Sequence, residues 1–268
     1  MSLGGMKPLH AWPLADRQSL VGVLTDIDDT LTTEGAITAD ALQALTALRA
    51  AGLSVMAVTG RPVGWSEPFA RAWPVQAIVA ENGAVALVRE ADGRLRKLYQ
   101  QDAATRDRNF QRLQDVAHQI VQTVPSAQLA QDSAGRETDI AIDHSEFTQL
   151  PQACIEQVVA MMRAQGLHAT VSSIHINGWI GDHDKLSGAR WIVRELLGRD
   201  LDAEIARWVY VGDSTNDERM FAHFPNAVGV ANIRRFTPVL RHLPTYVSDG
   251  ERGAGFAQVA RAVLDARA

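Results

Sequence analysis

The sequence predicts an α/β protein whose core is a doubly wound, Rossmann-like parallel sheet, with a smaller α+β domain inserted into it. Three observations favour this fold class. Short apolar runs alternate with helical patterns early in the chain, the alternation stops near Gly83, and it resumes after residue 180. A length of 268 residues also favours a large core plus a smaller domain. We therefore expect a discontinuous core at 20–83 and 181–268, around a domain inserted at 84–180.

The first core segment predicts three buried strands joined by helices. Its apolar runs are short and bounded by acidic residues or glycine, which is typical of strands that are buried on both faces of a parallel sheet. In order, the expected elements are a strand at 20–25, a helix at 38–51, a strand at 53–59, a short helix at 68–73 and a strand at 77–80. Sheets of this kind bind ligands beyond the carboxyl ends of their strands.

The inserted segment has a different pattern. Two runs around Asp92-Gly93 predict a hairpin, a local antiparallel signal that marks the expected domain boundary. Mixed strands and helices follow, and they predict a compact sheet with helices on one face. The expected elements are the hairpin at 84–89 and 95–99, helices at 105–123 and 151–165, and strands at 138–143, 169–173 and 175–180. A helix at 185–197 and strands at 207–211 and 227–230 then resume the core.

Composition and the first residues of the sequence limit where we expect the protein to be located and what we expect it to bind. The start, Met-Ser-Leu-Gly-Gly, lacks a basic segment followed by an apolar one, so we interpret 1–19 as a tag remnant plus an N-terminal extension. The single cysteine, Cys154, cannot form an internal disulfide, and no apolar run reaches the roughly 18 residues of a membrane span. We therefore expect a cytoplasmic protein without a membrane anchor. A net charge of -5, with no cluster of Lys and Arg, argues against nucleic-acid binding. The oligomeric state stays open.

Three acidic residues end the first predicted strand. Asp26, Asp28 and Asp29 stand where burial is costly for carboxylates unless cations or hydrogen bonds compensate. Along an extended segment Asp26 and Asp28 project to the same side, so that one can attack a reacting centre while the other moves protons. Asp29 points away. A turn or a helix cap would account for one or two of these residues, but not for their coincidence with the motifs that follow.

A second acidic motif, Gly-Asp-Ser-Thr-Asn-Asp at 212–217, follows the strand at 207–211. Two such strand ends can be neighbours in a parallel sheet. Asp26, Asp213 and Asp217 would then gather hard oxygen ligands suited to Mg²⁺. The alternative is an Asx-type turn that leads into a helix cap.

Two weaker features could bind phosphate. Thr59, Gly60 and Arg61 follow the second strand, where a hydroxyl and a glycine amide suit a phosphate oxygen because glycine lets the backbone approach closely. Thr59 would serve equally well as a cap of the next helix. Lys185 opens a predicted helix, where its ammonium could neutralise a phosphate and a carboxylate. An exposed lysine is the alternative.

Together and in this order, these four motifs closely resemble the haloacid dehalogenase superfamily of phosphatases and phosphomutases. The resemblance covers roughly 20–83 and 181–265, with Asp-Ile-Asp-Asp-Thr as the first motif, Thr59 as the second, Lys185 as the third and Gly-Asp-Ser-Thr-Asn-Asp as the fourth. The insertion falls between the second and third motifs, which implies a type C2 cap, as in the Cof-like, sucrose-phosphate and trehalose-phosphate phosphatases. Glu-Asn-Gly-Ala at 81–84 is similar to the turn before the cap in that group.

The resemblance implies a magnesium-dependent phosphatase that acts on a small phosphorylated metabolite, with a sugar phosphate as the expected substrate. It implies that Asp26 is the nucleophile and forms an aspartyl-phosphate, while Asp28 protonates the leaving oxygen and later activates water. Mg²⁺ would be held by Asp26, the Asp28 backbone carbonyl and Asp213, with Asp217 reaching it directly or through water. The resemblance also implies that Thr59 and Lys185 hold the phosphoryl oxygens and that Asn216 supports the same site. Gly60 is a further candidate from its place after the second strand, and Arg61 is a weaker one.

The sequence says least about which residues contact the leaving group of the substrate. His175 and Asn177 alternate on the strand that leads to Lys185, so both are candidates to project from the cap toward the leaving group. A structural histidine and a turn asparagine are the alternatives, and Arg136 is a weaker candidate. A sugar phosphomutase would use the same core, and a non-catalytic phospho-ligand-binding protein would keep the fold. The intact acid pair and Lys185 argue against the latter.

Overall fold

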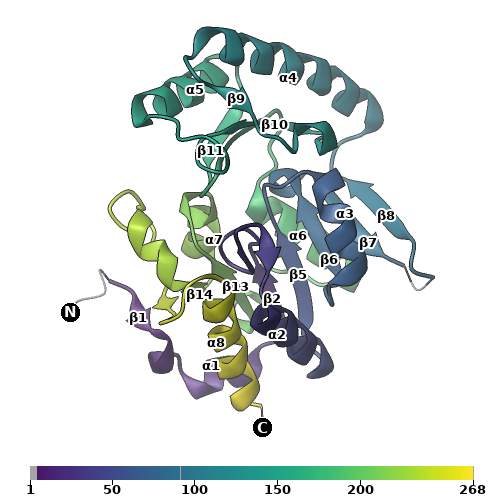
Figure 1. Ribbon diagram of the computed structural model, residues 1–268. Coiled ribbons are helices and arrows are strands. Elements are labelled where there is room, and N and C mark those ends of the chain that lie inside the picture. Colours follow the sequence, from purple (N-terminus) through teal and green to yellow (C-terminus); the bar gives the residue numbers. More distant parts are fainter. Residues whose placement is uncertain (1–4, 91, 268) are drawn as a thin grey trace.

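The computed structural model describes residues 5–90 and 92–267, so the first four residues of the predicted tag lie outside it. The predicted fold class is confirmed: a mostly parallel sheet forms the core, and a smaller sheet with two helices forms an insertion on top of it (Figure 1). None of the described helices combines the length and the apolar character needed to cross a bilayer.

The main sheet crosses the whole core. Its strands in spatial order are β1 (Lys7–Pro8), β15 (Tyr246–Val247), β14 (Asn226–Gly229), β13 (Trp208–Gly212), β2 (Gly22–Thr25), β5 (Ser54–Val58), β6 (Ala77–Ala80), β7 (Val85–Arg89) and β8 (Leu95–Tyr99). All neighbours from β1 to β6 pair in parallel, and the last two strands add an antiparallel edge. The order reverses beside β2, the first central strand, and such switch points are where α/β proteins bind ligands.

Alternate side chains of the central strands enter two separate hydrophobic cores. Val23 of β2 packs with one core, and the next residue, Leu24, packs with the other. Because successive side chains of a strand point to opposite faces, both faces need helices, and this explains the uninterrupted apolar runs of the sequence. Helices α2 (Ala39–Ala50), α3 (Val63–Ala72) and α8 (Arg252–Asp265) cover one face, with α1 (Leu14–Ser19) beside α8; α6 (Lys185–Leu197) and α7 (Glu218–His223) cover the other.

The insertion is a four-stranded antiparallel sheet under two helices. Its elements are α4 (Ala103–Thr123), β9 (Gln128–Leu129), β10 (Asp139–Asp143), α5 (Gln152–Ala164), β11 (His168–Val171) and β12 (His175–Trp179), with the strand order β11-β12-β10-β9. Ile140, Ile142 and Ile176 pack with the helices. The alternate residues of β10 and β12 are buried on the other face and include the polar Asp139 and Asn177 beside Ala141 and Trp179; Asn177 contacts the core.

Three segments differ from the predicted boundaries. The hairpin at 84–99 was expected to belong to the insertion, but β7 pairs with β6 and extends the main sheet instead. The extension ahead of residue 20 is also part of the core, because β1 pairs with β15 and Trp12 is buried. Helix α3 begins at Val63 instead of at Pro68, since Pro62 is its N-cap and Pro68 lies inside it. A two-stranded ribbon, β3 (Thr32–Thr33) and β4 (Ala36–Ile37), follows β2.

Candidate active site

The strand order brings the first and fourth motifs together. β2 lies between β13 and β5, and the main-chain N–H of Asp26 donates to the carbonyl of Val211 at 2.9 Å. Asp26, Asp213 and Asp217 are all buried, and each offers an oxygen within 4.8 Å of the others. The two acidic strand ends are thus neighbours in the sheet, as we expected from the sequence.

Lys185 enters this cluster from the first turn of α6. The helix begins in a capping box, in which Asp184 accepts from the Ser187 N–H at 2.7 Å and the Ser187 hydroxyl accepts from the Asp184 N–H at 2.8 Å. The helix also approaches the 81–83 turn very closely: a Cβ on Gly188 would lie 2.6 Å from the Gly83 Cα. These two constraints fix the start of α6 and therefore the root of the Lys185 side chain.

The Lys185 ammonium joins two carboxylates. Its Nζ lies 2.6 Å from Asp26 Oδ1 and 2.7 Å from Asp217 Oδ1, and all three side chains are buried. Burial disfavours the ammonium, but the charges of Asp217 and Asp26 outweigh burial and raise the pKa of Lys185 above its ordinary value. Lys185 is therefore a cation at any physiological pH.

Asp217 has no oxygen left over. Its Oδ1 accepts from Lys185 and from the Tyr210 hydroxyl at 2.5 Å, and its Oδ2 accepts from the backbone N–H groups of Asp213 and Ser214 at 3.0 and 3.2 Å. A carboxylate with this many donors is poorly placed to bind a cation directly. The contacts instead make Asp217 the residue that holds Lys185 beside Asp26.

The two oxygens of Asp213, by contrast, differ in their contacts. Its Oδ2 accepts from Asn232 at 3.0 Å and from Arg235 at 3.4 Å, but its buried Oδ1 has no hydrogen-bond partner among the described residues. Burial, followed by the charges of Asp26 and Asp217, raises the pKa of Asp213 well above its ordinary value. Burial also raises the pKa of Asp26, and despite the opposing charge of Lys185 it reaches about 8.

A hard cation would bind the Asp213 oxygen that has no partner, and it would stabilise the ionised forms of Asp26 and Asp213. Asp26 and Asp213 have the free oxygens to hold such an ion, whereas Asp217 could reach it only through the groups that it already binds. The residues present therefore fit a divalent cation with oxygen ligands.

The raised pKa values make stability depend on both pH and cations. In the cation-free protein, the pKa of Asp26 rises from 3.8 to about 8 on folding, so the folded state binds more protons between those values. The free energy of unfolding therefore falls as pH increases from about 4 to about 8. A bound cation removes this penalty and adds binding free energy. We expect the melting temperature to decline over this range in EDTA and to decline less in Mg²⁺.

The Asp213→Asn variant is the matched test of this expectation. It removes one charge from the cluster, so its melting temperature should decline less in EDTA and should respond little to Mg²⁺. Identical pH profiles for the wild type in EDTA and in Mg²⁺ would contradict the assignment of a cation to this cluster.

Residues 23–139 match the sequence model of a family described as haloacid dehalogenase-like hydrolase. The match runs from the first central strand into the insertion. No curated protein sequence matches this chain closely enough to be counted as a relative.

Solved structures resemble the chain over nearly its whole length. A Thermoplasma acidophilum protein is 17% identical with a TM-score of 0.68, covering 91% of this chain and 99% of that one. A putative HAD/COF-like hydrolase from Plasmodium vivax is 16% identical with a TM-score of 0.67, and the alignment covers 94% of this chain and 99% of that one. The sucrose-phosphatase from Synechocystis sp. PCC6803, solved in complex with sucrose and phosphate, is 15% identical with a TM-score of 0.63, covering 91% and 98%. At these identities the likeness shows the fold.

Other predicted core residues lie close to Asp26. Thr59 accepts from the Arg61 N–H at 3.0 Å through its hydroxyl oxygen, which leaves the hydroxyl proton available to a ligand. Asn216 accepts from the Ser214 hydroxyl at 2.9 Å. Thr59, Gly60 and Asn216 line one narrow cavity with Asp26 and Asp28. Its volume is about 10 Å³, which is room for about one water molecule.

The two predicted cap residues line this narrow cavity, and one side-chain nitrogen of each is already bound. His175 Nε2 lies 2.7 Å from Glu146 Oε2, and the Asn177 side-chain N–H donates to the Gly60 carbonyl and to Asp139, both at 3.3 Å. Asn177 thus ties the insertion to the 59–61 loop of the core.

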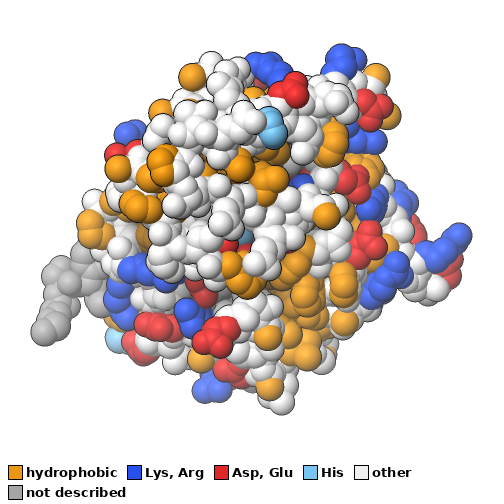
Figure 2. Space-filling view, turned by 45° about the horizontal axis from the view of Figure 1, so that its top comes forward, with side chains coloured by type: hydrophobic (Ala, Val, Ile, Leu, Met, Phe, Trp, Pro, Cys, Tyr) orange, Lys and Arg blue, Asp and Glu red, His pale blue; other side chains and the backbone are white. Residues whose placement is uncertain are grey.

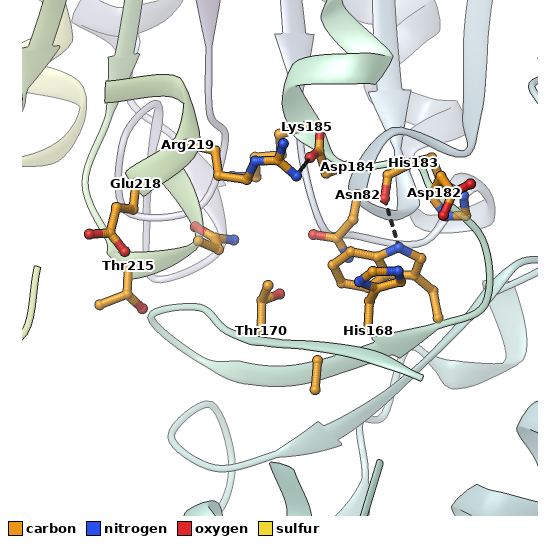
Figure 3. Close-up of a pocket in the computed structure, with 13 residues that line it drawn as sticks. Asn82, His168, Thr170, Asp182, His183, Asp184, Lys185, Thr215, Glu218 and Arg219 are labelled. Atoms are coloured by element: carbon orange, nitrogen blue, oxygen red, sulfur yellow. Dashed lines mark hydrogen bonds and ion pairs between the residues drawn. The ribbon is translucent and has the colours of Figure 1, made fainter. Parts of the chain in front are cut away.

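Two larger cavities flank the narrow one. One has a volume of about 690 Å³, and it shares Asp28 and Arg61 with the narrow cavity. The other, of about 230 Å³, lies on the Lys185 side and shares Asn216. Figure 3 shows this second cavity, where Thr170 and His168 of the insertion face Thr215 and Arg219 of the core. Asp28 lies at the junction of the narrow cavity and the larger one.

Buried charged residues connect the core to the insertion. Glu81 accepts from the backbone of Val63, Glu137 and Thr138 and from the Thr138 hydroxyl, and burial raises its pKa in spite of these donors. Arg136, a weak candidate from the sequence, donates to the Gly60 carbonyl at 3.0 Å and to Asp139 at 2.7 Å. The Glu-Asn-Gly-Ala motif marks Glu81, but its partners at 137 and 138 could not be predicted because they are distant in the sequence.

Proposed function

We propose that this protein removes a phosphoryl group from a small phosphate monoester through an aspartyl-phosphate on Asp26. The observation that carries the proposal is the Lys185 ammonium, which lies 2.6 Å from Asp26 and is held there by Asp217. An anionic nucleophile attacks an anionic phosphate only if nearby positive charge offsets their repulsion. Lys185 supplies a fixed part of that charge without access to bulk water.

In the first step, the Asp26 carboxylate attacks phosphorus and the bond from phosphorus to the leaving oxygen breaks. Asp28 gives its proton to that oxygen. In the second step, water attacks the same phosphorus, Asp28 takes a proton from the water, and the bond to Asp26 breaks to release inorganic phosphate. Lys185, the Thr59 hydroxyl and Asn216 hold the phosphoryl oxygens. Mg²⁺ on Asp26, Asp213 and the Asp28 backbone carbonyl would supply the remaining positive charge.

A sugar phosphate is the substrate class that we propose. The leaving group must lie beside Asp28, and the cavity of about 690 Å³ begins there. Its lining includes the hydroxyl, imidazole and amide groups of Thr32, His144, Ser145, Gln149 and Ser173, which suit the hydroxyls of a polyol. Support also comes from the fold likeness to the sucrose-phosphatase, whose structure contains sucrose and phosphate.

Phosphate release from a panel of sugar phosphates, measured in Mg²⁺ and in EDTA, tests the function. We expect turnover of at least one compound, and its loss in EDTA should be reversed by added Mg²⁺. No phosphate release from any compound would contradict the proposal. Conversion of a sugar phosphate that requires a sugar bisphosphate and proceeds without steady phosphate release would favour a mutase.

The Asp28→Asn variant gives a second expected result. It lacks the base for the second step, so p-nitrophenyl phosphate should phosphorylate Asp26 and the phosphoryl-enzyme should accumulate. Intact-protein mass spectrometry should then show the added mass of one phosphoryl group. The control is the wild type, in which hydrolysis keeps the intermediate scarce. A variant that turns over at the wild-type rate would exclude Asp28 as the base.

A further inference from the structure

Two arginines of the core line the cavity of about 690 Å³ beside a single carboxylate. Arg235 comes from the short 3₁₀ helix at 231–236, and Arg252 is the first residue of α8. Arg252 Nε lies 3.0 Å from Asp29 Oδ1, and a terminal nitrogen of Arg235 lies 3.2 Å from Asp29 Oδ2. We call Arg235 and Arg252 the arginine pair. Its two positive charges thus share the one carboxylate of Asp29.

The other acids that line this cavity do not balance the arginine pair. Asp28 and Glu146 both form ion pairs with Arg61, at 2.9 and 2.7 Å. Glu34 lies on the exposed turn between β3 and β4, where water screens its charge. The wall of the cavity that the arginine pair forms therefore keeps an excess of positive charge.

The arginine pair also has N–H groups to spare. Arg235 donates through one terminal nitrogen, to Asp29 and in a longer contact of 3.4 Å to Asp213. The Nε of Arg252 is close to Asp29 but makes no hydrogen bond with good geometry, and its terminal nitrogens have no partner among the described residues. A guanidinium carries five N–H donors in a planar fork that matches a carboxylate or a phosphate. Free donors and excess charge together suit an oxyanion.

The backbone holds Arg252 in an uncommon conformation. Its φ is 52°, in the left-handed region that residues other than glycine seldom adopt. Asn232 accepts from the Arg252 N–H at 2.9 Å and donates to the Asp29 carbonyl at 3.0 Å. A Cβ on the next residue, Gly253, would clash with the Thr38 hydroxyl. Such strain persists only where the surroundings enforce it, and it is frequent at ligand-binding sites. The start of the Arg252 side chain is therefore fixed beside Asp29.

We propose that the arginine pair binds a second anionic group of the substrate, so that the preferred substrates are phosphate esters whose sugar or polyol part also carries a carboxylate or a second phosphate. This inference rests on the proposed phosphatase function and narrows its substrate class. The leaving group lies in the cavity that begins at Asp28, and its anionic group contacts the arginine pair in the same cavity. A sugar phosphate without that group leaves these donors to water and binds more weakly.

Competition against hydrolysis of p-nitrophenyl phosphate in Mg²⁺ measures the affinity of an ester, whether or not the ester is itself hydrolysed. In one series C6 of glucose 1-phosphate carries a hydroxyl, a carboxylate (glucuronic acid 1-phosphate) or a phosphate (glucose 1,6-bisphosphate). A shorter series compares glycerol 3-phosphate with 3-phosphoglycerate. We expect the wild type to bind at least one ester with a second anion about 10-fold or more tightly than its counterpart without it. The anion that gives the larger gain is the one that the site recognises.

The Arg252→Gln variant should remove most of this gain. It should change the affinity for the counterpart ester and the turnover of p-nitrophenyl phosphate by less than about twofold, because Arg252 contacts neither the nucleophile nor the phosphate-binding groups. Arg252→Lys keeps the charge but loses the fork, so it should retain part of the gain. Arg94→Gln makes the same change at an exposed arginine of the hairpin at 84–99 and should leave every affinity unchanged.

Three results would overturn the proposal. One is equal affinity of the wild type for every member of each series, which needs no variant and so does not depend on how well a variant folds. The others are a gain that Arg252→Gln leaves in place and an equal loss of affinity for esters with and without the second anion. Each of these results leaves the phosphatase function standing, because that function is tested by phosphate release from the wild type alone.

Discussion

Replacing Asp26 by asparagine is expected to abolish phosphate release on every substrate that the wild type hydrolyses, by at least about 10⁴-fold. The amide has nearly the same shape as the carboxylate and can still accept from Lys185, but it cannot form an acyl-phosphate. Burial raises the pKa of Asp26 to about 8 in the cation-free protein, so the variant should be no less stable than the wild type at pH 8. Inactivity with unchanged stability is thus the expected signature of a nucleophile.

Activity assays and chemical denaturation of the same preparation check both parts of this prediction. Phosphate release by Asp26→Asn above the background of the assay would show that another group attacks phosphorus. A variant that is inactive and also unfolds far more easily would show only that Asp26 maintains the fold. The Glu156→Gln variant changes an exposed residue of α5 and is a suitable control for purification and assay.

Lys185→Met should have the second largest effect, and it should change both activity and stability. Methionine fills a similar volume but leaves Asp26 and Asp217 buried without their shared cation. Removing one partner of a buried ion pair typically costs about 3–5 kcal/mol in the free energy of unfolding. Loss of a preorganised positive charge at the reacting phosphate should lower kcat by about 10²–10³-fold.

The pH dependence of unfolding makes this second prediction specific. At about pH 5 Asp26 binds a proton in the cation-free protein, so the loss of Lys185 should cost less there than at pH 8. Urea unfolding in EDTA at both pH values measures the difference. Lys7→Met, at an exposed lysine, is the control and should show neither effect. An equal cost at both pH values would contradict the coupling between Lys185 and Asp26.

Much of the site could be predicted because its residues follow apolar strands. A run such as 20–25 can be buried only as a central strand, and parallel strands present their carboxyl ends at one edge of the sheet. This places Asp26, Thr59 and Asp213 together before any coordinates are considered. Lys185 required the family resemblance, since nothing in its own surroundings distinguishes a catalytic lysine from an exposed one.

The interface residues could not be predicted for a physical reason. Glu146 and Arg61 are 85 residues apart, and neither has a local partner that would mark it. The hairpin at 84–99 was recognised as a hairpin, but its sheet could not be, because the alternation of a hairpin is the same in either sheet. Strands as short as β1 and β15 have too few residues to show any period.

Lys and Arg side chains are interspersed with Asp and Glu side chains over the surface seen in Figure 2. The prediction that the protein does not bind nucleic acid is compatible with this surface. It remains a prediction.

The polar face of the insertion sheet has a consequence for how the protein behaves when it opens. A large apolar patch that becomes exposed when two parts of a protein separate favours self-association. Here the exposed sheet face would carry Asp139, His175 and Asn177 beside Ala141 and Trp179, while the isoleucines stay under the insertion helices. Separation should therefore expose a mixed surface with one large aromatic side chain, and we expect the open protein to remain monodisperse.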